Sequence, residues 1–193
     1  MSGFSKGLLV GVVGPSGVGK DSVMEAMAAA REDVFLVRRA ITRSEHLGGE
    51  AFDGVTEEQF DVMIEDDAFA LHWPAHGMRY GVPWSELQRL QKGGIGLVNL
   101  SRATLTKAEA QFDRFVTLHL SAPKEVLAQR LAARGRESEE EIEERLARAK
   151  FSLPAGVIRV IGVSNTGTLA DTARAAFAAL DQAQPESARR CIR

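Results

Sequence analysis

The sequence predicts an α/β protein in which helices flank a parallel sheet, with an inserted lobe and a short helical lid. Three observations lead to this class. Short apolar runs alternate with segments long enough for helices, a glycine-rich loop directly follows the first run, and a turn-rich block interrupts the alternation. The 193 residues, 45% hydrophobic and 26% charged, suffice for about one globular domain, which we expect over residues 1–181.

Each predicted strand is a short run of apolar residues. Residues 8–13 form the first, and their nearly continuous apolar character is typical of a strand buried on both faces of a parallel sheet. The other predicted strands are 35–37, 95–100, 115–120 and 157–163. Because most connections between them are long enough for a helix, we expect the strands to run parallel.

Apolar periodicity and capping residues predict the helices. The first spans residues 21–31, directly after the glycine-rich loop, and the last begins near Thr168. Thr56 and Gln59 form a capping-box pattern before a helix at 60–65. Two further helices are predicted at 123–134 and 138–151.

Two stretches do not fit the alternation of strands and helices. Residues 42–92 are rich in turn residues, aromatic residues and charges, which indicates an inserted lobe between core segments 7–41 and 93–181. Residues 134–148 hold the densest charge run, which by itself is typical of a solvated helix. The polar residues 182–193 lack periodicity, so we expect a flexible tail.

Composition excludes several classes of protein. With 24 basic and 26 acidic residues the formal net charge is −2, so no basic excess indicates a nucleic acid or an anionic membrane as partner. The single cysteine, Cys191, excludes an intramolecular disulfide and a cysteine zinc cluster. The first apolar run is too short to span a membrane. We therefore expect a cytoplasmic protein, and the sequence does not indicate an oligomeric state.

A phosphate-binding motif occupies the segment after the first strand. Residues 14–20 match G-x-x-x-x-G-K, and a helix follows. Glycines let successive backbone N–H groups converge on phosphate oxygens, the helix N-terminus adds its positive dipole, and Lys20 reaches the β and γ phosphates. We predict that a nucleoside triphosphate binds to Gly14, Pro15, Ser16, Gly17, Val18, Gly19, Lys20, Asp21 and Ser22. The motif does not name the acceptor, because motors, GTPases and kinases share it.

The residue after the lysine departs from the usual motif. A serine or threonine normally stands there and coordinates Mg²⁺, whereas this chain has Asp21, with the hydroxyl one place later at Ser22. One interpretation is that Asp21, with or without Ser22, provides part of the shell of Mg²⁺, which prefers oxygen ligands. The other is that Asp21 only stabilises the positive end of the helix, by about 0.3–1 kcal/mol.

The phosphate loop resembles that of the guanylate kinases, and the resemblance extends over nearly the whole chain to about Leu180. Its further motifs are Thr42-Arg43 with Gly49-Glu50, Asp67-Ala68-Phe69, Tyr80-Gly81, Arg134-Gly135-Arg136 with Arg145, and Ser164-Asn165. Within this superfamily the chain most resembles the ribose 1,5-bisphosphate phosphokinase family. The residues that carry this second resemblance are Gly19 to Ser22, Arg39, Ile41-Thr42-Arg43, Tyr80-Gly81-Val82, Val98-Asn99, Ser101-Arg102-Ala103 and Arg134 to Glu137.

The resemblance implies a reaction. ATP is the phosphoryl donor and Mg²⁺ the metal, ribose 1,5-bisphosphate is the acceptor, and the products are ADP and 5-phospho-α-D-ribose 1-diphosphate, in phosphonate catabolism. The small-molecule partners are therefore ATP and a sugar bisphosphate. Because the attacking phosphate oxygen is already anionic at neutral pH, we expect catalysis by positioning and charge neutralisation rather than by a general base.

Departures from the guanylate kinase pattern concern the acceptor. Leu71, Pro83, Asn99 and Ser101 stand where guanylate kinases have the glutamate, serine and aspartates that read guanine. Each lost charge-assisted hydrogen bond is worth about 1.5–3 kcal/mol, so we expect GMP to be a poor acceptor. The alternative reading is a nucleoside monophosphate kinase, with guanylate kinase as the named case. A non-catalytic protein-binding module would not need Lys20 in an intact phosphate loop.

The resemblance also assigns acceptor residues. Arg43 and Tyr80 match the residues that hold the acceptor phosphate in guanylate kinases, whereas His46 replaces the second arginine. Further predicted substrate-binding residues are Arg39, Asn99 and Arg102. Arg39, Arg102, His72, His76 and Arg79 together are more cationic groups than one phosphate requires. The alternative is that Arg38, Arg39 and Arg79 are surface charges and that the two histidines are loop residues whose hydrogen bonds are satisfied.

Catalytic and adenine-flanking residues complete the prediction. Arg134, Arg136 and Arg145 resemble the arginines of the family's lid, which closes over the transferring phosphoryl group, and act with Lys20. Asn165 lies in the segment that flanks the adenine in guanylate kinases. Its sequence, Ser-Asn-Thr-Gly before a helix, is equally typical of a turn and a cap.

Overall fold

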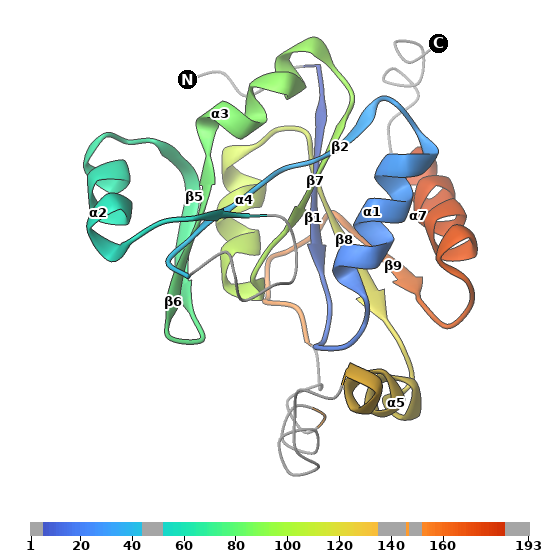
Figure 1. The fold of residues 1–193 in the computed structure, drawn as a ribbon. Helices are drawn as coiled ribbons and strands as arrows, with labels where there is room; N and C mark the ends of the chain where they lie inside the picture. The colour runs from blue at the N-terminus through green and yellow to red at the C-terminus, as the bar shows by residue number, and fades with distance from the viewer. Residues whose placement is uncertain (1–5, 44–51, 135–145, 147–151, 184–193) are drawn as a thin grey trace.

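A five-stranded parallel sheet forms the centre of the protein. The computed structural model describes residues 6–43, 52–134, 146 and 152–183. The strands are β1 (Leu8–Val13), β2 (Val34–Leu36), β7 (Ile95–Asn99), β8 (Phe115–Ser121) and β9 (Val160–Ser164), in the order β2-β7-β1-β8-β9 (Figure 1). Every pairing between neighbours is parallel. The predicted fold class and its five strands are therefore confirmed.

The strand order places the first strand in the middle of this sheet. All six residues of β1 are buried, as its uninterrupted apolar run predicts. The chain leaves β1 toward β2 at one edge of the sheet and later continues from β7 to β8 on the other side of β1. The connection after β1 and the connection after β7 therefore lead to opposite sides of the sheet. In open α/β sheets, ligands bind where two such connections separate, at the carboxyl ends of the strands.

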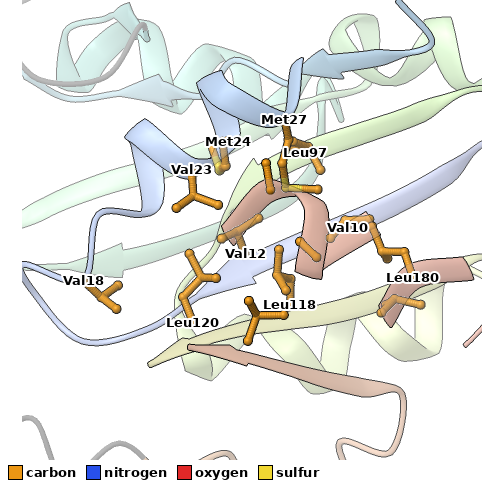
Figure 2. Packing of buried hydrophobic residues seen from close by; sticks show 14 of the residues in the cluster. Val10, Val12, Val18, Val23, Met24, Met27, Leu97, Leu118, Leu120 and Leu180 are labelled. Atoms are coloured by element: carbon orange, nitrogen blue, oxygen red, sulfur yellow. The ribbon is translucent and has the colours of Figure 1, made fainter. Parts of the chain in front are cut away.

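Helices cover one face of the sheet with a continuous apolar cluster. α1 (Lys20–Ala30) and α7 (Leu169–Ala183) pack against each other and the sheet (Figures 1 and 2). α5 (Lys124–Arg134) joins them near the phosphate loop (Figure 1). α1 contributes Val23, Met24 and Met27 to the same cluster as strand residues such as Val12 and Leu118. Helical spacing of these side chains explains why the segment after the loop folds as a helix.

A second apolar cluster covers the opposite face of the sheet. The helix α4 (Leu105–Gln111) lies there, preceded by the short 3₁₀ turn η3 (Arg102–Thr104). α3 (Trp84–Leu87) and η2 (Gln88–Lys92) also pack on this face, through Leu87 and Leu90. These last two elements fall within the predicted inserted lobe of 42–92, yet their side chains join the cluster of the main sheet.

A smaller, mixed sheet adjoins this second cluster. It contains β3 (Ala40–Ile41), β4 (Asp53–Gly54), β5 (Phe69–Ala75) and β6 (Met78–Pro83), in the order β4-β3-β6-β5. β5 and β6 form an antiparallel hairpin. The sheet begins with β3, two residues before the boundary predicted for the lobe, because β3 pairs with β4 and β6 rather than with the main sheet.

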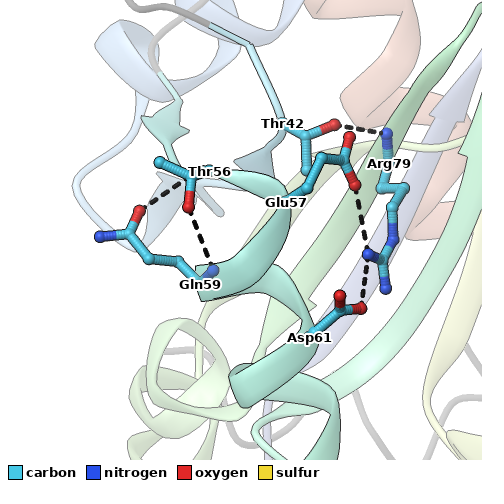
Figure 3. Close-up of polar contacts among 6 residues, drawn as sticks. All are labelled: Thr42, Thr56, Glu57, Gln59, Asp61 and Arg79. Carbon is cyan, nitrogen blue, oxygen red and sulfur yellow. Dashed lines mark hydrogen bonds and ion pairs between the residues drawn. The ribbon is translucent and has the colours of Figure 1, made fainter.

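One helix covers the outer face of the smaller sheet. α2 (Glu57–Glu65) packs Phe60 against Phe69, with ring centroids 4.6 Å apart. Its predicted capping box is confirmed: the Gln59 backbone N–H donates to the Thr56 hydroxyl at 3.2 Å, and the Thr56 N–H donates to the Gln59 side chain at 2.8 Å (Figure 3).

Part of the predicted lid and tail lies outside the described residues. The predicted helix 138–151 and Arg136 and Arg145 belong to this part, apart from Leu146, which is buried in the cluster of α1 and α7. Arg134 is the last residue of α5. α7 runs to Ala183, two residues into the predicted tail. Within the described ranges, no helix combines the length and apolar character needed to cross a bilayer.

Candidate active site

The phosphate loop joins the end of β1 to the start of α1 at the carboxyl edge of the sheet. Gly17 and Gly19 have φ angles of 80° and 85°, which side-chain-bearing residues rarely adopt. At Gly14 the constraint is space, because a Cβ atom would lie 2.5 Å from the Leu120 carbonyl oxygen. The loop can therefore turn tightly against β8 only with glycine at these positions.

Lys20 begins α1 and reaches back over the loop. Its Nζ donates to the carbonyl oxygens of Gly14, at 3.1 Å, and Pro15, at 3.4 Å. The ammonium group is thus held beside the loop backbone, within reach of any phosphate that the loop N–H groups bind. This position supports the predicted role of Lys20 in neutralising a triphosphate.

Asp21 and Asn99 meet where α1 faces the end of β7. Asn99 Nδ2 donates to Asp21 Oδ1 at 3.1 Å, and both side chains are partly buried. Among the described residues, no group of three or more histidine, cysteine, aspartate or glutamate side chains gathers to hold a metal ion. The Asp21 carboxylate suits Mg²⁺, which commonly takes one or two protein carboxylates and completes its shell with phosphates and water.

A buried arginine lies on two stacked aromatic rings beside this pair. Trp73 and Tyr80, opposite each other in the β5–β6 hairpin, stack with centroids 5.6 Å apart and planes 8° apart. The guanidinium carbon of Arg39 lies 5.1 Å from the centroid of Tyr80 and 5.9 Å from that of Trp73. Arg39 is only 6% exposed. The β2–β3 connection carries it, at the junction of the two sheets.

Burial lowers the pKa of Arg39 to about 10, against the opposing attraction of Tyr80 and Asp21. The guanidinium therefore stays charged at pH 7, in a place where charge is unfavourable. Perturbed groups of this kind are concentrated at functional sites. Because Asp21 is the residue after Lys20, this attraction places the Arg39 charge near the phosphate loop and the start of α1.

Arg79 and His72 belong to the opposite face of the hairpin, which corrects part of the count of excess cations. The Arg79 guanidinium contacts Asp61 at 2.7 Å and Glu57 at 3.2 Å and lies 4.4 Å from the Phe60 centroid (Figure 3). Hydrogen bonding to Asp61, and then to Glu57, raises its pKa. The carboxylates of α2 therefore balance this charge, because alternate residues of β6 face opposite sides.

Neither histidine is placed beside Arg39 in the aromatic stack. The pKa of His72 is lowered by burial and then by the nearby charges of Lys107 and Arg79, so the imidazole is neutral at pH 7. His76 lies in the tight turn of the hairpin with a φ of 53°. Among the described residues, the cations that lie beside the phosphate loop and the aromatic stack are therefore lysine and arginine side chains such as Lys20 and Arg39.

The remaining predicted substrate residues lie around the same edge. Arg43 follows β3, and its guanidinium carbon lies 5.2 Å from the centroid of Phe52. Arg102 lies after β7, and its guanidinium donates to the Ser152 carbonyl oxygen at 3.4 Å. The positions of Arg136 and Arg145 relative to this edge are not described.

Asn165 is buried between the phosphate loop and α7. It is 1% exposed, Nδ2 donates to the Val18 carbonyl oxygen at 2.8 Å, and Oδ1 accepts from the Thr172 hydroxyl at 2.9 Å. Its amide thus contacts the phosphate loop and α7. Thr168 provides the cap of α7, since the Asp171 backbone N–H donates to its hydroxyl at 3.1 Å.

Sequence reasoning missed three residues of the site: Trp73, Arg130 and Thr172. The Arg130 guanidinium also donates to the Val18 carbonyl oxygen, at 3.3 Å. A signal for Thr172 exists, because it is a polar residue beside the apolar face of the last helix. Trp73 could have been found from the two-residue alternation that pairs it with Tyr80.

Comparisons with known proteins agree with this geometry. No protein-family model matches the chain. The chain is 50% identical over 166 residues to the ribose 1,5-bisphosphate phosphokinase PhnN of Ruegeria sp. (strain TM1040), covering 86% of this chain and 87% of that protein. It is 40% identical over 183 residues to the protein of the same name from Rhizobium etli (strain CIAT 652), covering 93% and 92%.

A solved structure supports the fold independently. The crystal structure of guanylate kinase from Anaplasma phagocytophilum matches with a TM-score of 0.66 and 18% identity, over 95% of this chain and 89% of that chain. At this identity the match supports the architecture alone. The identity to the two curated relatives extends over most of both chains, and from it we conclude that the chain belongs to the ribose 1,5-bisphosphate phosphokinase family.

Proposed function

We propose that this protein transfers the γ-phosphoryl group of ATP to ribose 1,5-bisphosphate, giving 5-phospho-α-D-ribose 1-diphosphate and ADP. The observation that carries the proposal is the buried guanidinium of Arg39, which lies on Tyr80 and is attracted by Asp21 of the phosphate loop. A permanent charge next to a phosphate loop suits an acceptor that is itself a phosphate ester. Family membership supports the same reaction.

The chemistry requires little beyond positioning and charge. A terminal phosphate oxygen of the acceptor attacks the γ phosphorus, the bond to the β,γ-bridging oxygen breaks, and ADP leaves with that electron pair. Lys20 would neutralise the triphosphate, and Arg39, Arg43 and Arg102 would hold the acceptor. Asn99 would orient Asp21, to which it is hydrogen bonded at 3.1 Å. Mg²⁺, when bound, would neutralise charge on the phosphates.

The surroundings of the predicted base-reading positions support a sugar rather than a nucleotide acceptor. Leu71, which stands in place of a guanine-reading glutamate, is fully buried in the apolar cluster with Trp73. Pro83 ends β6 and is also buried. Neither side chain can accept a hydrogen bond from a base, so a guanine edge would lose partners there.

The proposed reaction also involves a lid, an acceptor-binding lobe and a cytoplasmic location. Arg134, Arg136 and Arg145 would close over the transferring phosphoryl group from residues 134–148, and 42–92 would carry the acceptor lobe, in the domain division given above. Water would then be excluded from the reaction. We place the reaction in the cytoplasm, without nucleic acid or membrane partners, on the basis of charge balance and the single cysteine.

The direct test compares two acceptors. In a coupled assay of ADP release with ATP and Mg²⁺, kcat/KM with ribose 1,5-bisphosphate should exceed that with GMP by about 10³-fold, because at least two charge-assisted hydrogen bonds to guanine are missing. The product should be identified as 5-phospho-α-D-ribose 1-diphosphate by mass. Preferential activity with GMP would instead establish the nucleoside monophosphate kinase alternative.

The metal role of Asp21 has its own test. Asp21→Asn should shift the Mg²⁺ concentration for half-maximal activity upward by about tenfold, because one carboxylate ligand or water acceptor is lost. The matched control is Asp66→Asn, at the exposed end of α2. If both variants keep the wild-type activation curve, Asp21 acts only on the helix terminus.

A further inference from the structure

A buried amide and a buried hydroxyl connect the last helix to the phosphate loop. Asn165 is 1% and Thr172 is 2% exposed, and the Thr172 hydroxyl oxygen lies 2.9 Å from Asn165 Oδ1. Asn165 Nδ2 lies 2.8 Å from the Val18 carbonyl oxygen, although 147 positions separate these residues in the chain. Buried polar side chains are stabilising only when fully hydrogen bonded, so this chain of contacts requires a reason.

The direction of each hydrogen bond in the chain is fixed. A carbonyl oxygen only accepts, so the Asn165 side chain must present its NH₂ group to Val18 and its oxygen to Thr172. The Thr172 hydroxyl is also 3.1 Å from the Thr168 carbonyl oxygen, which accepts the Thr172 backbone N–H at 3.0 Å as well. Because Asn165 Oδ1 can only accept, its 2.9 Å contact requires that the single hydroxyl proton of Thr172 is directed at Asn165.

This arrangement orients one peptide group of the loop. In a trans peptide the C=O and the following N–H point in opposite directions. Because the Val18 carbonyl is directed at Asn165, the N–H of Gly19 points away from it. Arg130 donates to the same carbonyl oxygen at 3.3 Å and fixes the peptide from α5.

The position of Asn165 is itself fixed from two sides. Its backbone N–H donates to the Ser121 carbonyl oxygen at 2.8 Å, which ties it to the end of β8. A Cβ atom at Gly19 would lie 3.0 Å from Asn165 Nδ2, so the close approach also explains the glycine. The Asn165 amide therefore has little conformational freedom, and a change in the position of α7 would move the loop peptide that it contacts.

We propose that Thr172 is a positioning residue for the donor phosphates: through Asn165 it holds the Val18–Gly19 peptide so that the Gly19 N–H is presented to bound phosphate. This inference rests on the proposed function, in that it takes ATP as the ligand of the loop. It assigns Asn165 to the loop backbone rather than to the adenine.

The test compares three substitutions of buried threonine hydroxyls. Thr172→Val removes the donor at nearly constant volume, whereas Thr172→Ser retains it. Thr117→Val is the matched control, because Thr117 is fully buried and its hydroxyl has no hydrogen-bond partner among the residues that the structure describes. Titration calorimetry with ATP and Mg²⁺ should give a Kd about tenfold higher for Thr172→Val and values within about twofold of wild type for the other two.

A second readout separates positioning from general destabilisation. In steady-state kinetics Thr172→Val should raise KM for ATP by about the same tenfold factor and leave KM for the acceptor unchanged. Equal ATP affinity of Thr172→Val and Thr117→Val would overturn the inference. If Thr172→Val does not fold, Thr172→Ala makes the same comparison.

A third readout covers failure of the proposed function. If the wild-type protein does not bind ATP, the proposed function fails, and the amide resonance of Gly19 in the ligand-free protein decides the inference. That resonance should shift in Thr172→Val but not in Thr117→Val. An unchanged resonance would show that the loop peptide keeps its orientation without the hydroxyl.

Discussion

Replacing Lys20 by methionine is expected to lower kcat for phosphoryl transfer by about 10³-fold, since one preorganised charge or donor at a reacting centre is worth about 10²–10³ in kcat. The Lys20 ammonium donates to the carbonyl oxygens of Gly14 and Pro15. These hydrogen bonds are local contacts within the loop and are only partly buried, so Lys20→Met should change thermal stability little. Single-turnover rates with ATP and ribose 1,5-bisphosphate, together with the melting temperature, measure both effects.

The control for Lys20 is Lys92→Met. Lys92 is exposed and precedes β7, so it lies at the opposite edge of the sheet from the phosphate loop. This variant should keep the wild-type rate. A Lys20→Met protein that is folded and turns over within tenfold of wild type would contradict the assignment of the loop as the donor site.

Replacing Arg39 by methionine should raise KM for the acceptor by about 100-fold, because charge-assisted hydrogen bonds to an acceptor phosphate are worth about 1.5–3 kcal/mol each. Stability should stay constant or increase. The pKa of Arg39 is about 10 in the fold, below the ordinary value of an arginine. Burial of the charge therefore lowers the free energy of unfolding at pH values below 10, and this penalty is relieved only as the pH rises above 10. An apolar side chain of similar length removes the penalty at all pH values.

Arg38→Met is the matched control for Arg39→Met. Arg38 is the preceding residue but is exposed, and its guanidinium pairs with Asp53 at 2.5 Å. Acceptor KM should not change in this variant, and melting curves should differ little, because exposed ion pairs contribute about 0–1 kcal/mol. If the two arginine variants have equal acceptor KM values, the buried guanidinium does not bind the acceptor.

The main sheet could be predicted from the sequence because its strands are short apolar runs with turn residues between them. β1 and β7 are buried on both faces, so their side chains carry the signal without interruption. β9 was predicted to start at residue 157 but starts at Val160. The preceding backbone is held elsewhere, since the N–H groups of Ile158 and Arg159 donate to the Glu109 carboxylate on α4.

The smaller sheet was harder to predict for a physical reason. β3 and β4 have two residues each, too few to produce a pattern, and they are defined only by pairing with distant partners. In β5 the alternation is obscured, because residues on both faces are apolar where α2 covers one side and the main cluster covers the other. Tertiary contacts rather than local preference determine these elements.

For the site, the sequence predicted the loop but not what supports it. Gly14 to Lys20 are contiguous, so their spacing alone indicates the phosphate cradle. The contact of Asn165 with Val18 joins residues 147 positions apart and depends on how β9 and α7 pack. The sequence also could not show that Arg79 is not available to an acceptor phosphate. Its partners Glu57 and Asp61 come close to it only because α2 packs on the hairpin.

The β5–β6 hairpin limits how the chain length can vary among relatives of this protein. On one face of the hairpin, Arg79 forms an ion pair with Asp61 of α2. On the other face, the ring of the neighbouring Tyr80 contacts the Arg39 guanidinium. Gain or loss of one residue in the turn at His76 and Gly77 would shift the register by one and exchange the two faces, placing an arginine in the aromatic stack and a tyrosine against the carboxylates. Changes of two residues would preserve both faces, so length variation in this turn should occur in even steps.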